Sequence, residues 1–323
     1  MACLLRELCF YAGIDSTSKP KEACCAVVEA GCCCLCVGRC CSAQRSAGRA
    51  IAARAPGVTL LGSHSSAANS VAGRAFAGTP RTDPDFATHW NLGPRLADLS
   101  DPSRAAVATF WMSFNVQRWA DAGAVLAVRH EGSIGAVMGV GRVRGAHDWG
   151  RKTWLQSAGE CAVVCRFVCS GQMPSIYTDK TLSGVGDAVK RRTDGPGGLL
   201  DTFTKMHTQH TAGMAAHWYV ALMAVDPSIQ GQRLCSRLMR ALCEQADAEG
   251  LPVYLETSGT RNTTVYARFG FAVVGTHRMA VEGDEDGSGP FEQCYAMVRP
   301  AAAAAAAPSA QTISRVEPDG MAV

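Results

Sequence analysis

Several side chains that could move protons lie in the C-terminal half of the sequence. Asn262 and Tyr266 are four residues apart, so they share one face if this segment is helical. A phenol such as Tyr266 can donate a proton to a departing group. Glu256, Asp226 and His217 could accept a proton, and Glu256 ranks first because it ends a predicted strand beside the tyrosine segment. A relay through water would need none of the three, and simple packing or capping roles for Tyr266 and Asn262 stay open.

The segment before these residues has the features of a phosphate-binding turn. The run WYVALMAVDPSIQGQRLCSRLMRAL reads as a strand, an Asp-Pro stop, a short loop and a helix. Gln230 and Gly231 stand just before the first apolar helix position. A helix N-terminus offers unpaired N–H groups and the positive end of a dipole, which together bind phosphate. Such turns also occur without a ligand, so this motif alone does not identify a site.

Two linked motifs carry a resemblance to a known family. VDPSIQGQRLCSRLM resembles the acetyl-CoA motif of the GNAT superfamily of N-acetyltransferases, V-x-P-x-x-Q/R-G-x-G-x-G/A. About 30 residues later, YLETSGTRNTTVYARFGF is similar to that superfamily's second segment, Y-L-E-T-S…N…Y…GF. Strong similarity covers roughly residues 217–275, and the order of elements extends it to about 84–299. Two motifs in this order and separation are more specific than either one alone.

The resemblance implies an enzyme that transfers an acetyl group from acetyl-CoA to an amine of unknown identity. It implies Tyr266 as general acid, beside Glu256 as our candidate base. The implied cofactor contacts are backbone groups of Ala224 and Val225, the loop and helix start at Gln230, Gly231, Gln232, Arg233, Leu234 and Cys235, and the side chain of Asn262. Arg233 and Cys235 replace the second and third glycines of the family pattern. Weaker or altered CoA binding is therefore expected, and a non-catalytic acyl-CoA sensor or scaffold is the alternative.

The elements that must position these residues follow from periodicity. Apolar residues at helical spacing predict a helix over 103–121, and two β-rich runs over 124–129 and 134–143 predict a hairpin. The further expected elements are strands at 217–225, 253–256, 271–278 and 292–298 and helices at 231–249 and 262–269. This order predicts an α/β (α+β) fold with a GNAT-like central mixed, largely antiparallel sheet flanked by helices.

The ends and one internal segment depart from this pattern. Residues 1–83 are expected to be a disordered leader rich in Cys, Ala and Arg, which resembles a transit peptide but carries four acidic residues. Residues 84–299 would form the N-acetyltransferase domain, with an irregular insertion over about 144–216 shaping the acceptor pocket. Residues 300–323 read as a disordered, Ala-rich tail. The acidic run 282–286 is expected to be a solvated hairpin loop.

Composition excludes several classes. The net charge of +3 comes from the first 82 residues, which carry +5. The rest of the chain therefore lacks the excess of basic residues that is typical of a nucleic-acid-binding protein. No apolar stretch reaches the roughly 20 residues that span a bilayer. Ten of the 16 cysteines lie in the first 41 residues, where low complexity is favoured over a zinc site, and no metal is expected. We expect a soluble intracellular protein, in the cytoplasm or in a chloroplast or mitochondrion.

Overall fold

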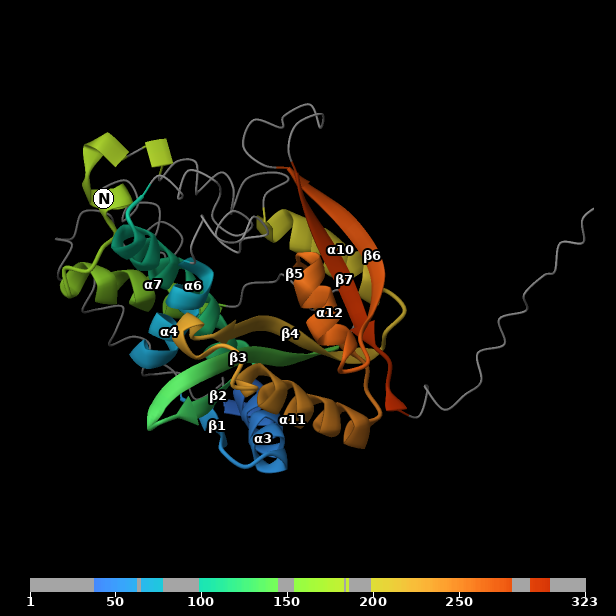
Figure 1. Cartoon of the computed structure of the whole chain (residues 1–323). Coiled ribbons are helices and arrows are strands. Elements are labelled where there is room, and N and C mark those ends of the chain that lie inside the picture. The colour runs from blue at the N-terminus through green and yellow to red at the C-terminus, as the bar shows by residue number, and fades with distance from the viewer. Residues whose placement is uncertain are drawn as a thin grey trace, which may run out of the picture.

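A mixed sheet forms the centre of the molecule (Figure 1). The computed structural model describes residues 38–62, 65–77, 99–144, 154–182, 184–185, 199–280 and 291–302. Within these ranges, seven strands follow the order β1-β2-β3-β4-β5-β7-β6. Only β4 and β5 pair in parallel, and every other neighbouring pair is antiparallel, which confirms the predicted sheet type. The strands are β1 Val58–Leu61, β2 Ala124–His130, β3 Ser133–Arg144, β4 Ala216–Val225, β5 Val253–Ser258, β6 Ala272–Ala280 and β7 Phe291–Arg299.

Helices cover both faces of this sheet. The first face packs against α4 (Ser66–Ala77), α6 (Asp101–Ala122) and α10 (Leu199–Thr211). The second face packs against α3 (Gly38–Arg54) and α11 (Leu234–Glu249), with Tyr266 of α12 (Thr260–Ala267) at its margin. Successive strand side chains alternate between the two cores, as the pleat requires. We call these the α6 face and the α11 face.

The amphipathic helix predicted over 231–249 is α11. Its apolar stripe includes Leu234, Leu238 and Leu242, all buried against the sheet. Gly250 ends it with φ of 64°, a left-handed conformation that glycine adopts without steric cost. The helix begins three residues later than predicted, because residues 231–233 form a turn.

The prediction that residues 1–83 form a disordered leader is wrong for the described residues 38–62 and 65–77. β1 pairs with β2 along four residues, and α4 buries Ala68, Val71 and Ala72 on the α6 face. A Cβ at Gly73 would clash with Thr109 of α6, so the two helices approach closely. Small residues thus build a helix–helix interface here, although the same Ala- and Arg-rich composition is typical of leaders.

The predicted irregular insertion contains helices. The described residues between β3 and β4 form α7 (Trp154–Cys169), the short helix α8 (Ser175–Thr178), the 3₁₀ turn η4 (Lys180–Leu182) and α10. Trp111 of α6 donates its indole N–H to the Tyr177 hydroxyl at 2.8 Å and so fixes α8 to α6. The run CAVVCRFVC lies in α7, where Cys165 is buried and Cys169 is exposed.

Three predictions fall on residues outside the described ranges. They are the Cys-rich segment up to residue 37, the acidic loop 282–286 and the tail beyond residue 302. No helix among the described residues is long and apolar enough to cross a membrane.

Candidate active site

β4 and β5 separate partway along the sheet. Their parallel pairing runs only from Trp218 opposite Val253 to Val220 opposite Leu255. At the same level the register between β3 and β4 shifts, because Val140 faces Val220 while Gly139 faces Leu222, which leaves Ala221 as an extra residue. A β-bulge of this kind bends its strand and is common beside active sites. The C-terminal halves of β4 and β5 are therefore not paired with each other, and we call this place where the two strands separate the split.

Glu256 is the first β5 residue beyond the last pair with β4. Strand alternation places its side chain on the α6 face with Tyr254, whose ring stacks on Tyr219 of β4 at 6.0 Å between centroids. Burial raises the pKa of the Glu256 carboxyl to about 8, while the hydroxyls of Tyr219 and Tyr254 oppose that rise. Its Oε1 atom is buried and has no hydrogen-bond partner among the described residues. A buried carboxyl with an unused oxygen at the split can bind an amine and take its proton.

Tyr266 lies on the opposite side of the sheet. It comes from α12 and packs on the α11 face, with its ring 6.0 Å from that of Phe271. Burial, and secondarily the nearby Cys235 thiol, raise the pKa of the Tyr266 phenol well above its ordinary value. The phenol therefore keeps its proton at neutral pH. The two sequence-predicted catalytic residues thus lie on opposite faces of the sheet.

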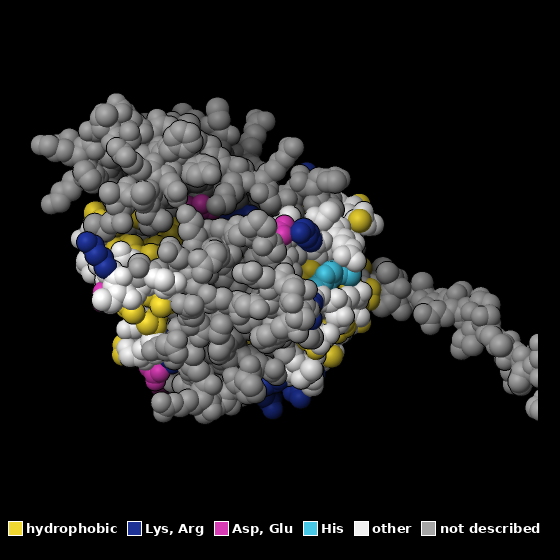
Figure 2. All heavy atoms as spheres, turned by 90° about the horizontal axis from the view of Figure 1, so that it is seen from above, with side chains coloured by type: hydrophobic (Ala, Val, Ile, Leu, Met, Phe, Trp, Pro, Cys, Tyr) yellow, Lys and Arg dark blue, Asp and Glu magenta, His cyan; other side chains and the backbone are white. Residues whose placement is uncertain are grey.

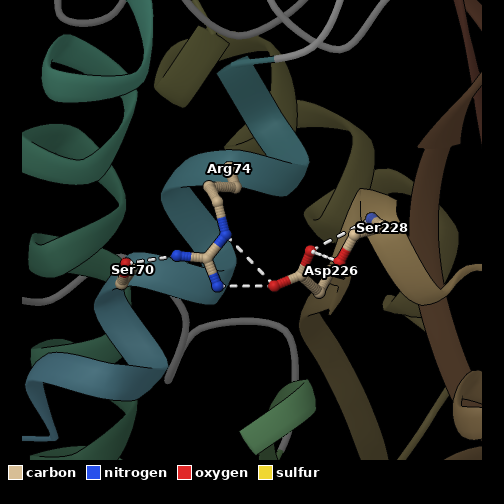
Figure 3. A network of polar contacts seen from close by, with 4 residues as sticks. All are labelled: Ser70, Arg74, Asp226 and Ser228. Carbon is tan, nitrogen blue, oxygen red and sulfur yellow. Dashed lines mark hydrogen bonds and ion pairs between the residues drawn. The ribbon is translucent and has the colours of Figure 1, made fainter. Parts of the chain in front are cut away.

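The loop after β4 is held by a residue from the N-terminal segment. Arg74 of α4 donates from Nε and Nη2 to Oδ2 of Asp226, at 3.1 and 2.5 Å (Figure 3). Asp226 uses its other oxygen to accept from the backbone N–H and hydroxyl of Ser228, at 3.1 and 2.8 Å. Although burial opposes it, these hydrogen bonds lower the pKa of the Asp226 carboxyl. Asp226 is therefore an anchored anion that shapes the loop, and it is not the base.

The start of α11 fits a phosphate. Gln230, Gly231 and Gln232 are exposed, and Gly231 has φ of 85° with open space where a Cβ would stand. The first intrahelical bond joins the N–H of Arg237 to the carbonyl of Arg233 at 3.1 Å. The N–H groups of Leu234, Cys235 and Ser236 precede that bond, so they are available to an anion.

Arg233, which stands where the family pattern has its second glycine, has a backbone conformation that favours glycine. It is left-handed, with φ of 58° and ψ of 20°, which costs a non-glycine residue about 1–2 kcal/mol. We expect Arg233→Gly to be about 1 kcal/mol more stable than Arg233→Ala, since both remove the charge and only glycine removes the strain. Urea unfolding of the two variants measures the difference. Equal stabilities would contradict the assignment of strain to this position.

An open groove of about 560 Å³ continues from this turn along α11. Its lining is rich in charge and combines three arginines with two acidic residues. It consists of Arg233, Ser236, Arg240, Cys243, Glu244, Asp247, Arg268 and Phe269. The groove is therefore suited to a polar, anionic group bound next to the helix N-terminus.

The other site residues predicted from the sequence make contacts within the protein itself. His217 is buried in the paired part of β4, and its Nε2 lies 3.0 Å from Nε2 of His207. Burial lowers the pKa of His217 to about 4, so it is neutral and removed from the split. Asn262 donates to the carbonyl of Ser258 at 2.9 Å, so it braces the first turn of α12. Ala224 and Val225 of β4 line the split and pair on their other side with β3.

Sequence reasoning missed three residues of the site. Tyr254 precedes Glu256 by two, so alternation along the strand places it on the same face. Tyr219 could be found only by aligning the parallel strands. Arg74 carried no signal, because its helix was assigned to the leader.

Part of the sequence matches a known family. Residues 191–271 match the model of the acetyltransferase (GNAT) family. An uncharacterized N-acetyltransferase of Schizosaccharomyces pombe is 37% identical over 54 residues, which cover 17% of this chain and 22% of that protein. The chain thus spans about a fifth of the length of this curated relative. The similarity to the GNAT family is thus shown for residues 191–271.

Solved acetyltransferase structures align along most of the chain. The histone acetyltransferase HPA2 and related acetyltransferase of Corynebacterium glutamicum is 18% identical, with a TM-score of 0.41, and covers 76% of this chain and 97% of its own. The polyamine N-acetyltransferase of Drosophila melanogaster is 14% identical, with a TM-score of 0.40, and covers 75% and 99%. The similarity to the family rests on the sequence match of residues 191–271, and the description of the fold rests on the sheet itself.

Proposed function

We propose that the protein is an acetyl-CoA-dependent N-acetyltransferase whose acceptor is an amine. The observation that carries this proposal is the position of Glu256 at the split in the sheet, with Tyr266 on the opposite face. Direct transfer needs a base on the side where the amine enters and a proton donor where the thiolate leaves. The two faces of the sheet supply one each.

Glu256 would accept the proton of the attacking amine on the α6 face. Its unused Oε1 atom can take an N–H hydrogen bond, and Tyr219 and Tyr254 flank it with hydroxyls. The amine nitrogen then forms a bond to the thioester carbonyl carbon in the split. Backbone N–H groups of β4 that no longer pair with β5 would stabilise the oxyanion that develops.

Tyr266 would act on the α11 face, where the carbon–sulfur bond breaks. Its phenol donates a hydrogen bond and then a proton to the CoA thiolate, which leaves as the thiol. The N–H groups at the start of α11 would bind the pyrophosphate, and the groove with Arg240 and Arg268 would take the remaining charged part of CoA. The insertion over about 144–216 contributes α10, which covers the α6 face of β5, β7 and β6 and so would shape the acceptor side.

Calorimetric titration of acetyl-CoA into the full chain, with CoA as the comparison, tests the proposal. We expect micromolar binding of both ligands, followed by amine-dependent release of CoA thiol when acceptors are screened. An absence of binding would overturn the proposed function. Binding without turnover on any amine would favour the non-catalytic acyl-CoA sensor instead.

A further inference from the structure

Two histidines outside the proposed active site point their ring nitrogens at one another. His210 of α10 and His277 of β6 bring their Nε2 atoms to 2.7 Å, with the ring planes at 83°. They lie 67 residues apart in the sequence, on an insertion helix and on the edge strand of the sheet. Both are partly exposed, and Figure 2 shows histidine side chains at the surface of the face it displays.

The backbone holds this pair in place. A Cβ at Gly275 would clash with the His210 ring, so the imidazole is seated directly on the bare backbone of β6. Residue 275 lies on the same side of the strand as His277, because the two are separated by one residue. The packing of α10 against the backbone of β6 therefore determines the position of the His210 ring beside His277.

We propose that His210 and His277 form a binding site for a divalent transition metal such as Zn²⁺, with water completing its coordination. Imidazole nitrogens are the commonest protein ligands of such ions. Two Nε2 atoms bound to one tetrahedral Zn²⁺ stand about 3.3 Å apart at Zn–N distances of about 2.0–2.1 Å. The observed separation of 2.7 Å needs to widen by only about 0.6 Å.

The chemistry of the two rings suits this role. Burial lowers the pKa of both imidazoles, so that both are neutral at pH 7. In the described part of the chain their only hydrogen bond is the one to each other, so each Nδ1 is free to carry the proton when Nε2 binds a metal. Within the described ranges no three His, Cys, Asp or Glu side chains form a metal site, which is why water must fill the remaining positions.

The chain contains a contrasting pair. His207 and His217 also face each other through Nε2, at 3.0 Å, but both are fully buried under Tyr219 and Tyr254. An ion and its water ligands cannot reach that buried pair. Accessibility therefore distinguishes a metal site from a structural hydrogen bond between the same groups. A metal at His210 and His277 would fasten α10 to β6.

Thermal unfolding of the full, reduced chain with and without Zn²⁺ tests the proposal. We expect 100 µM Zn²⁺ to raise the unfolding midpoint of the wild type by about 2–5 °C. The control is His130→Gln, because His130 is a half-exposed histidine on the β2–β3 hairpin, and it should behave as the wild type. His210→Gln and His277→Gln should each lose the shift and one equivalent of bound zinc measured by elemental analysis.

Cysteine thiolates are general zinc ligands and the chain has 16 cysteines, so the difference between variants is decisive and the total zinc content is not. An equal shift and equal zinc content in the wild type and in both pair variants would overturn the proposal. If one variant fails to fold, the other still decides, because each removes one of the two ligands.

Discussion

Replacing Glu256 with glutamine should lower kcat/KM by about 10²-fold, the scale of a lost general base. It should also remove one ascending limb from the pH profile. The carboxyl has a pKa raised to about 8 by burial, so the free enzyme holds this proton below pH 8. Only the deprotonated form is a base, and kcat/KM therefore rises with pH and levels off above about 8. Glutamine has the same shape and cannot titrate.

The measurement is initial rates of CoA thiol release between pH 6 and 9.5, with the amine that reacts fastest in the screen. The amine's own ionisation is common to both enzymes, so the difference between their profiles isolates Glu256. Glu131→Gln is the control, because Glu131 lies in the exposed turn between β2 and β3. A limb near pH 8 that persists in Glu256→Gln would assign the base to another group or to water.

Replacing Tyr266 with phenylalanine should lower kcat by about 10²-fold, with little change in the KM for acetyl-CoA. The hydroxyl acts on the departing sulfur, so its removal affects the transition state more than the bound ground state. The pKa of this phenol is raised well above its ordinary value, so it stays protonated throughout the accessible range. The loss should consequently be the same at pH 7 and at pH 9.

Tyr295→Phe provides the matched control for this variant. Tyr295 lies on β7, half-buried against the α11 face, and its hydroxyl donates to Oε1 of Gln293 at 3.3 Å in an exposed hydrogen bond. Its removal should leave kcat unchanged. If Tyr266→Phe and Tyr295→Phe behaved alike, Tyr266 would be a packing residue of the α11 face.

Much of the sheet could be predicted from the sequence. β4 is a continuous apolar run that ends at Asp226-Pro227, and α11 repeats leucine at helical spacing. Each element can therefore be predicted from its own stretch of sequence. Tyr266 and Glu256 were found because they stand in motifs of fixed spacing. Their placement on opposite faces was not predicted, since it depends on which core each side of β5 faces and on how α12 packs after β5.

The N-terminal elements were missed for a physical reason. The buried side of α4 includes Ala68, Ala72 and Gly73, and these small residues let α4 and α6 approach closely. Such residues give almost no periodic hydrophobic signal in the sequence. The tie between Arg74 and Asp226 joins residues 152 positions apart, so no local pattern could indicate it. The His210–His277 pair is equally non-local.

The outer position of β1 has a consequence for handling the protein. A fragment that begins at residue 84 would lose β1 and expose the backbone groups of β2, which pair with Val58–Leu61 in the whole chain. An uncovered strand of this kind recruits strands from other molecules, and five consecutive β2 residues are buried and apolar. Such a fragment would aggregate. Recombinant versions should therefore begin no later than Gly38, so that they retain α3 and the edge strand β1.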